Sequence, residues 1–189
     1  MKNQITILVC LHEDLKSYGK DKLYSDYFVW LKSELEYISQ RETVILLNRS
    51  RLPIELSTFD YQGQDVGAIL NSWKNVAADW HYTRVRSGNY DPRITKTLLL
   101  TRNNLNRTVG GVAHQGGSFA ISSITSFRFP AHEIGHMFHA THEDSAVEYD
   151  GWWHDSIMLT DNFSHLRGNT YRYSEKNRDN MRQYFNQLR

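Results

Sequence analysis

The chain has 189 residues, enough for one domain with a sizeable core, and 40% apolar with 23% charged residues is an ordinary globular composition. The formal net charge is +1 and no basic run suits a phosphate backbone, so we expect no nucleic-acid partner. No stretch is long and apolar enough to predict a membrane-spanning segment.

The first half of the chain predicts two strands and two helices. Residues 5–10 form an apolar run that indicates a buried strand, and it contains Cys10, the single cysteine. Cys10 has no partner for an internal disulfide, and we interpret it as a buried strand residue. Residues 22–40 and 66–80 carry apolar side chains three or four apart, which predicts helices, and residues 43–47 predict a strand between them.

The second half opens with turn residues at positions 87–92. Three strand candidates follow: residues 97–101, 108–114 and 118–124. A helix then begins within residues 126–131, because Pro130 is tolerated only in a first turn. A last helix begins after Ser174. This alternation of strands and helices indicates an α/β domain around one mixed sheet.

The helix near residue 130 contains the motif His132-Glu133-x-x-His136, and His142 follows six residues later. Residues four apart share a helix face, so His132 and His136 can bind one metal ion. Glu133 lies where a carboxylate can take a proton from water at the metal. If the helix stops and the chain turns back, His142 completes the site. This is the ligand arrangement of a zinc peptidase, and it predicts Zn²⁺ as cofactor.

His139 is an alternative third ligand, since it lies seven residues after His132 and would share its face on a continuous helix. Ligands on three successive turns span roughly 10 Å at 1.5 Å per residue. Zinc–nitrogen bonds are only about 2.1 Å long. We therefore favour His142, and whether His139 contributes to the site stays open.

HExxHxxxxxH followed by Ser156-Ile157-Met158 resembles the metzincin clan of zinc endopeptidases, with Met158 in the position of the structural Met-turn. Residues 98–113, with a Leu-Leu-Thr and a Thr-Val-Gly stretch, look like the reprolysin (adamalysin) branch. Metzincins have glycine where this chain has His139, and reprolysins carry disulfides that this chain cannot form. The resemblance therefore indicates a disulfide-free, bacterial relative of the branch.

The resemblance implies a metzincin-like α/β domain: a twisted mixed sheet with an antiparallel edge strand, an active-site helix and a C-terminal helix. We expect one catalytic domain over residues 1–189, with an upper part at 1–139 and a lower part at 140–189. Met158 would form an apolar floor beneath the imidazoles, and residues 159–163 would wall a substrate pocket. An extended protein or peptide substrate would pair with the sheet edge at Val109, Gly110, Gly111, Val112, Ala113 and His114.

The function so implied is a zinc-dependent endopeptidase with Glu133 as general base. Alternatives are a non-peptidase zinc hydrolase, a catalytically silent zinc-binding module of the same fold, and a structural zinc site, for which we find no convincing fourth ligand. The apolar run at residues 5–11 is too short for a signal peptide. We therefore favour a toxin or effector secreted or delivered without a visible signal peptide, with a cytoplasmic protease as the alternative. A monomer is favoured.

Overall fold

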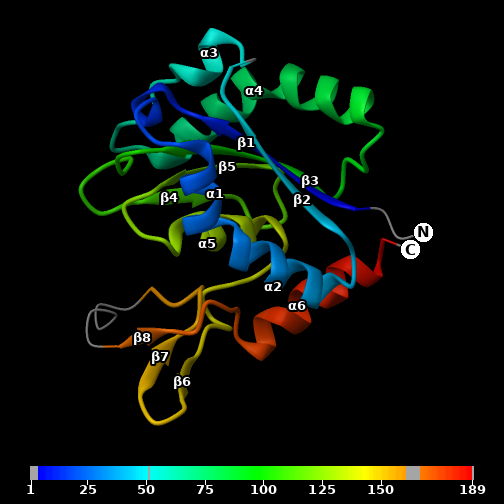
Figure 1. Cartoon of the computed structure of the whole chain (residues 1–189), viewed down its shortest axis with the longest axis vertical. Helices are drawn as coiled ribbons and strands as arrows, with labels where there is room; N and C mark the ends of the chain where they lie inside the picture. The colour runs from blue at the N-terminus through cyan, green and yellow to red at the C-terminus, as the bar shows by residue number, and fades with distance from the viewer. Residues whose placement is uncertain (1–3, 51, 161–166, 189) are drawn as a thin grey trace.

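The computed structural model describes residues 4–50, 52–160 and 167–188. A five-stranded sheet lies at its centre, in the order β2-β1-β3-β5-β4 (Figure 1). The strands are β1 (Ile5–Leu11), β2 (Thr43–Asn48), β3 (Thr95–Thr101), β4 (Gly111–Ala113) and β5 (Phe119–Ser123). All neighbouring pairs are parallel except β4 and β5, so β4 is an antiparallel strand at the edge. The predicted mixed sheet with an antiparallel edge strand is therefore confirmed.

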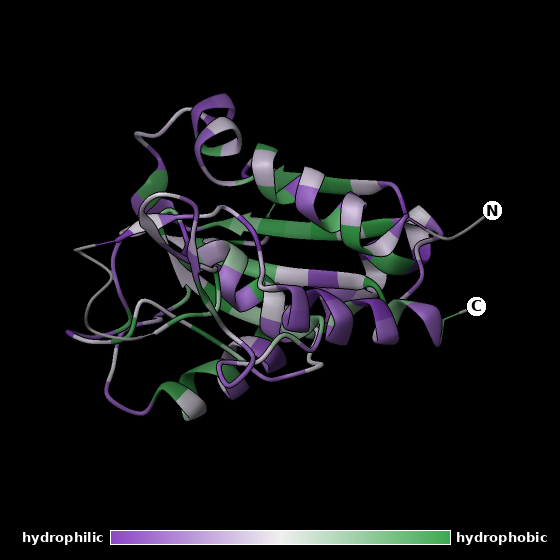
Figure 2. Cartoon of the chain, turned by 90° about the horizontal axis from the view of Figure 1, so that it is seen from below, coloured by the Kyte–Doolittle hydropathy of each residue, from purple (hydrophilic) through white to green (hydrophobic). Residues whose placement is uncertain are grey.

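Helices cover both faces of this sheet (Figure 1). One face carries α3 (Ile54–Ser57) and α4 (Val66–Gly88). The other carries α1 (Lys20–Tyr27), α2 (Val29–Ser39), α5 (Phe129–Met137) and α6 (Glu175–Asn186). Side chains of a strand alternate between its faces, and β1 accordingly places Ile7 and Val9 in one apolar cluster and Cys10 in the other. The green strands between helices with purple outer surfaces in Figure 2 show this layering.

A second, smaller sheet lies in the C-terminal part of the chain. Its strands are β6 (Val147–Tyr149), β7 (Trp153–Asp155) and β8 (Gly168–Asn169), in that order. The expectation of one sheet was therefore wrong. Strands of two or three residues are too short to show the alternation that identifies a strand in sequence.

An ion pair ties the C-terminal helix to the N-terminal half of the chain. Arg178 of α6 donates from Nε and Nη2 to the two carboxylate oxygens of Glu34 on α2, at 2.8 and 2.7 Å. Glu34 also accepts the backbone N–H of Tyr173 at 3.0 Å. Both charged side chains are 8% exposed, so losing one partner would leave a buried charge unpaired. These contacts fix Tyr173 and α6, which follow the small sheet in sequence, against α2 on the main sheet.

The predicted helix at residues 22–40 is divided into α1 and α2 at Phe28, whose backbone leaves helical geometry (φ −123°, ψ −23°). The Phe28 ring is fully buried, and apolar spacing alone does not report such a break. The predicted helix at 66–80 continues to Gly88, because His81 and Val85 extend its buried face. The predicted strand at 108–114 is shorter, since the side chain of Asn106 accepts the backbone N–H groups of Thr108 and Val109 in a turn.

Along the described ranges of the chain, no helix combines the length and the apolar character that crossing a membrane requires.

Candidate metal centre and cavity

Helix α5 carries the first two histidines of the motif. It begins at Phe129, inside the predicted window, with Pro130 in its first turn where a missing N–H does no harm. His132 and His136 lie four residues apart and therefore on one face of this helix. Their ring centroids are 4.8 Å apart.

The chain reverses immediately after α5. The helix ends at Met137, and the carbonyl of Gly135 accepts the backbone N–H groups of Phe138 and Ala140, both at 2.9 Å. His139 has a φ of 72°, in the left-handed region that non-glycine residues rarely adopt. This is the conformation for which glycine is usually chosen. The predicted reversal at His139 is present, and it returns His142 towards the helix.

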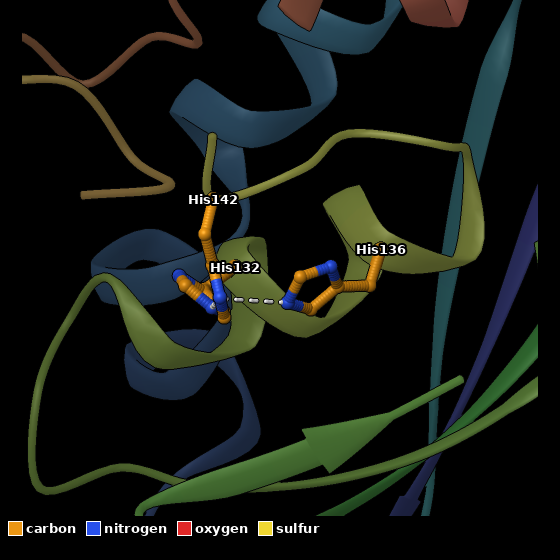
Figure 3. Close-up of side chains that lie close together, drawn as sticks. All are labelled: His132, His136 and His142. Atoms are coloured by element: carbon orange, nitrogen blue, oxygen red, sulfur yellow. Dashed lines mark hydrogen bonds between the residues drawn. The ribbon is translucent and has the colours of Figure 1, made fainter. Parts of the chain in front are cut away.

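The reversal brings the ring of His142 against the other two histidines (Figure 3). Its Nε2 atom lies 2.8 Å from Nε2 of His132 and 3.0 Å from Nε2 of His136. One ligand atom from each residue lies within 4.8 Å of the others. The three histidines can therefore share one metal ion.

The second ring nitrogens fix which atoms face the centre of this triad. Nδ1 of His132 lies 3.1 Å from the carbonyl oxygen of Ile157, and Nδ1 of His136 lies 3.0 Å from that of Ala140. A carbonyl oxygen only accepts hydrogen bonds, so each Nδ1 must carry the proton. Burial lowers the pKa of His132 to about 3 and also lowers the pKa of His136, which keeps both rings neutral at pH 7.

Neutral rings with protonated Nδ1 atoms present unprotonated Nε2 atoms. Two Nε2 lone pairs then point to the place where Nε2 of His142 also lies. Hydrogen bonds cannot satisfy all three nitrogens, because His142 has at most one proton to give from that atom. A metal cation satisfies all of them, since neutral imidazole is a preferred ligand of zinc and other transition metals. The carbonyl partners of His132 and His136 are the outer contacts that orient such ligands.

Glu133 lies beside the triad without belonging to it. Its side chain is 5% exposed, and burial raises the pKa of its carboxyl to about 8. Gly111 of β4 makes room for it: a Cβ atom on Gly111 would lie 2.5 Å from Oε1 and 2.7 Å from Cγ of Glu133. The sheet edge and the helix therefore hold this carboxyl between them.

A cavity of about 540 Å³ opens over these residues, and His132, Glu133 and His142 line it. Of the predicted substrate residues, Val109, Gly110 and Gly111 line one wall of the cavity. Ile157, Leu159 and Thr160 line the same cavity. Residues 161–163, the rest of the predicted pocket wall, lie outside the described residues.

The other predicted substrate residues lie further along the sheet edge. Val112 and Ala113 continue β4, with Val112 against the apolar cluster under α4 and Ala113 against the cluster on the opposite face. His114 follows the strand, and its carbonyl oxygen accepts the N–H of Gly117. The edge strand thus begins at the cavity and leads away from it.

Met158 is fully buried beneath the motif helix. A Cβ on Gly135 would lie 2.9 Å from the sulfur of Met158 and 2.6 Å from the ring of Tyr173. Glycine between the two histidines therefore lets both side chains approach α5 closely. Tyr173 also donates its hydroxyl proton to the carbonyl of Ala131 at 2.7 Å. Sequence reasoning did not find Tyr173, because no spacing links it to the motif.

His139 lies away from the triad. Its ring packs against the ring of Tyr184 on α6, with centroids 4.8 Å apart, and burial followed by the charge of Lys96 lowers its pKa. Lys96 is itself buried, donates to the carbonyl of Gly117 at 2.9 Å and lies 5.7 Å from the ring centre of Tyr184. The structure therefore gives His139 an aromatic neighbour while His142 joins the triad.

Sequence reasoning also overlooked Arg128, although it stands one helical turn before His132. It lines the cavity, and its charge is close enough to contribute to the lowered pKa of His132, after burial and His136. The spacing of four residues from a predicted ligand was the signal that could have identified it.

No family model matches this chain. No curated protein sequence matches it. The crystal structure of a zinc-dependent peptidase from Methanocorpusculum labreanum (strain Z) is similar, with a TM-score of 0.51 over 93% of this chain and 99% of that chain. The two sequences are 15% identical, so the likeness establishes a shared fold.

Proposed function

We propose that this protein is a zinc-dependent peptidase whose metal ligands are His132, His136 and His142. The observation that carries the proposal is the convergence of three Nε2 atoms, two of them unprotonated because their Nδ1 protons are held by backbone carbonyls. The structural neighbour is itself named as a zinc-dependent peptidase, which supports the same activity here. Among the described residues three side chains, rather than four, converge on this point, which favours a catalytic site over a structural one.

Zinc, when bound, supplies Lewis-acid chemistry that activates water and polarises a carbonyl group. Glu133 would act as the general base, taking a proton from the attacking water and passing it to the departing amine. Its carboxyl lines the same cavity as His132 and His142, which places it near the water that it would serve. Burial favours the protonated form of this carboxyl, and a dication held at the triad would favour the carboxylate form.

The edge strand β4 would bind the substrate. Its outer side has no strand neighbour among the described residues, and it begins at the cavity wall formed by Gly110 and Gly111. An extended peptide can add to such an edge through main-chain hydrogen bonds, which do not depend on side-chain identity. This arrangement suits an endopeptidase that acts on extended polypeptide.

The finer assignments belong to the same proposal. Met158 under Gly135 is the packing expected of a Met-turn, and the reversal at His139 followed by His142 is the ligand geometry expected of a metzincin. The reprolysin branch and the role as a delivered toxin or effector rest on the resemblance alone. Mapping newly formed protein N-termini in candidate target cells would test that role.

Hydrolysis of unfolded casein and of a mixed peptide library tests the proposal. The zinc-loaded protein should cut both, and Glu133→Gln should keep zinc while losing about 10²–10⁴-fold in rate. Glu143→Gln is the matched control, because it removes an exposed carboxylate next to His142 that stands outside the cavity lining. A wild type that binds zinc and cuts neither substrate would contradict the peptidase and favour a silent module or a different hydrolase.

A further inference from the structure

Arg128 lies where the cavity over the triad meets a second cavity. It lines the first cavity together with His132, and it lines the second, of about 390 Å³, together with Asp155 and Arg167. Its side chain is 17% exposed. Arg128 is the N-cap residue of α5 and stands four residues before His132, so the two residues are about 6 Å apart along the helix axis.

Arg128 shares a buried carboxylate with a second arginine. The buried carboxylate of Asp155, 1% exposed, lies between two guanidinium groups: Nη1 of Arg128 is 3.3 Å from Oδ2, and Nε of Arg167 is 2.6 Å from Oδ1. These three side chains form a charged trio in which Asp155 has a second cationic partner besides Arg128.

The contact of Arg128 with Asp155 is longer than that of Arg167. Charge-assisted N–H···O bonds are typically about 2.7–2.9 Å long, and the Arg128 contact with Asp155 is longer than this range. A guanidinium has five N–H donors, and the contact with Asp155 engages one nitrogen. Its planar geometry suits a carboxylate better than any other common group of a peptide.

The surroundings strengthen such a contact. Ile157 and Leu159 form the neighbouring wall of the cavity, and an apolar wall lowers the local dielectric constant. The N-terminal end of α5 also lies here, and its helix dipole adds partial positive charge. An anion bound at Arg128 would thus interact with the guanidinium under weak screening.

We infer that Arg128 selects substrates with a carboxylate close to the bond that is cut. The inference rests on the proposed function and adds the substrate class to it. A residue of extended peptide spans about 3.3 Å, so a group one helical turn from His132 reaches the first or second residue beside the cut bond. The carboxylate can come from an acidic side chain at that place or from the C-terminus of a substrate cut near its end.

A different role for the trio would be purely structural. Asp155 directly precedes the segment that carries Ile157 and Met158, so its ion pair with Arg128 also braces this segment against α5. A brace would affect all substrates equally. Charge selection would affect substrates with a carboxylate and leave matched neutral substrates unchanged.

The test uses pairs of peptides that are identical except for Glu or Gln at one position. That position is varied over the two residues on each side of a bond that the enzyme is known to cut. A second pair carries a free or an amidated C-terminus two residues after the cut. We expect kcat/KM to favour the carboxylate by about 10- to 100-fold at one of these places, the range of a charge-assisted hydrogen bond. Arg128→Gln should bring the ratio to about one, and Arg128→Lys should retain part of it.

Arg167→Gln is the matched control, because it removes the other guanidinium on Asp155 from a place that lines the second cavity alone. It should leave the Glu-to-Gln ratio unchanged. The two kinds of peptide pair identify the source of the carboxylate. A preference for Glu over Gln indicates an acidic side chain, and a preference for the free over the amidated C-terminus indicates a terminal carboxylate.

Binding of fluorescent peptides to zinc-loaded Glu133→Gln, followed by anisotropy, separates this inference from the proposed function. Tighter binding of the carboxylate peptide, lost on adding Arg128→Gln, supports the inference even if the wild type cuts nothing. Equal rates and equal binding for every pair overturn it while the peptidase stands. If Arg128→Gln lowers kcat/KM equally for acidic and neutral peptides, the inference is also overturned, and Arg128 then acts as a structural brace through its ion pair with Asp155.

Discussion

Replacing Gly111 with alanine tests how tightly the carboxyl of Glu133 is held. The added Cβ would lie 2.5 Å from Oε1, 2.7 Å from Cγ and 2.9 Å from Cδ of Glu133. Carbon atoms in contact are normally about 3.5–4.0 Å apart, so Glu133 would have to move by roughly 1 Å. Cγ lies near the start of the side chain, so a rotation at its far end cannot relieve this overlap.

The backbone of Gly111 lies outside the left-handed region, so alanine is allowed there and the effect comes from the Cβ alone. We expect overpacking to cost about 1–3 kcal/mol of stability, offset by about 0.5–1 kcal/mol from a stiffer unfolded chain. A misplacement of about 1 Å at a catalytic group can cost roughly 10²-fold in rate. Gly111→Ala should therefore keep zinc and fold but lose about two orders of magnitude in kcat.

The assay compares metal content, melting temperature and peptide hydrolysis of Gly111→Ala with those of Gly67→Ala. At Gly67, in the first turn of α4, a Cβ would lie 3.6 Å from Asp65 in ordinary contact, so activity should be unchanged. Wild-type kcat in a folded Gly111→Ala protein would refute the reasoning, because the position of Glu133 would then not matter to the reaction.

Three further predictions follow from the triad, the reversal and the buried lysine. Metal analysis should find one zinc per chain in His139→Ala and none in His142→Ala, and the opposite result would make His139 the ligand. His139→Gly relieves the strain of a φ of 72° but loses the contact with Tyr184, so thermal unfolding should show a change in stability of about 1 kcal/mol or less, with activity retained. His139→Val should lower stability far more, and a valine variant as stable as the wild type would argue against the reversal. Burial lowers the pKa of Lys96 from 10.5 to about 8, so between pH 8 and 10.5 the unfolded chain binds one more proton than the folded protein. The free energy of unfolding of the wild type should therefore rise with pH over this window relative to that of Lys96→Met, as measured by urea unfolding. Parallel stability curves for the two proteins over that window would contradict the lowered pKa.

The spacing of residues predicted those parts of the fold that depend on local periodicity. Residues 5–10 and 97–101 read as buried strands because both faces of β1 and β3 are covered by helices. The motif helix could be placed by Pro130, since proline restricts where a helix begins. The reversal at His139 could be predicted because a third ligand from a continuous helix would lie too far from His132.

Other features depend on contacts between segments distant in sequence, which no local pattern encodes. The break between α1 and α2 falls at Phe28, whose ring is fully buried, and the second sheet forms from strands of two or three residues. Tyr173 lies just before α6 in sequence and contacts the motif helix. The role that we infer for Arg128 depends on its position beside Asp155 and Arg167. The sequence therefore identified the three histidines that converge, but not the residues that hold or surround them.

A titration of the metal-free protein with zinc, with peptide hydrolysis as the readout, tests the central claim most directly. The initial rate should rise from near zero in proportion to added zinc and stop rising at one equivalent per chain, and His136→Ala should show no such rise. Hydrolysis that does not depend on zinc, or saturation with one zinc per chain and no hydrolysis of any peptide, would contradict the claim that this triad is the centre of a zinc-dependent peptidase.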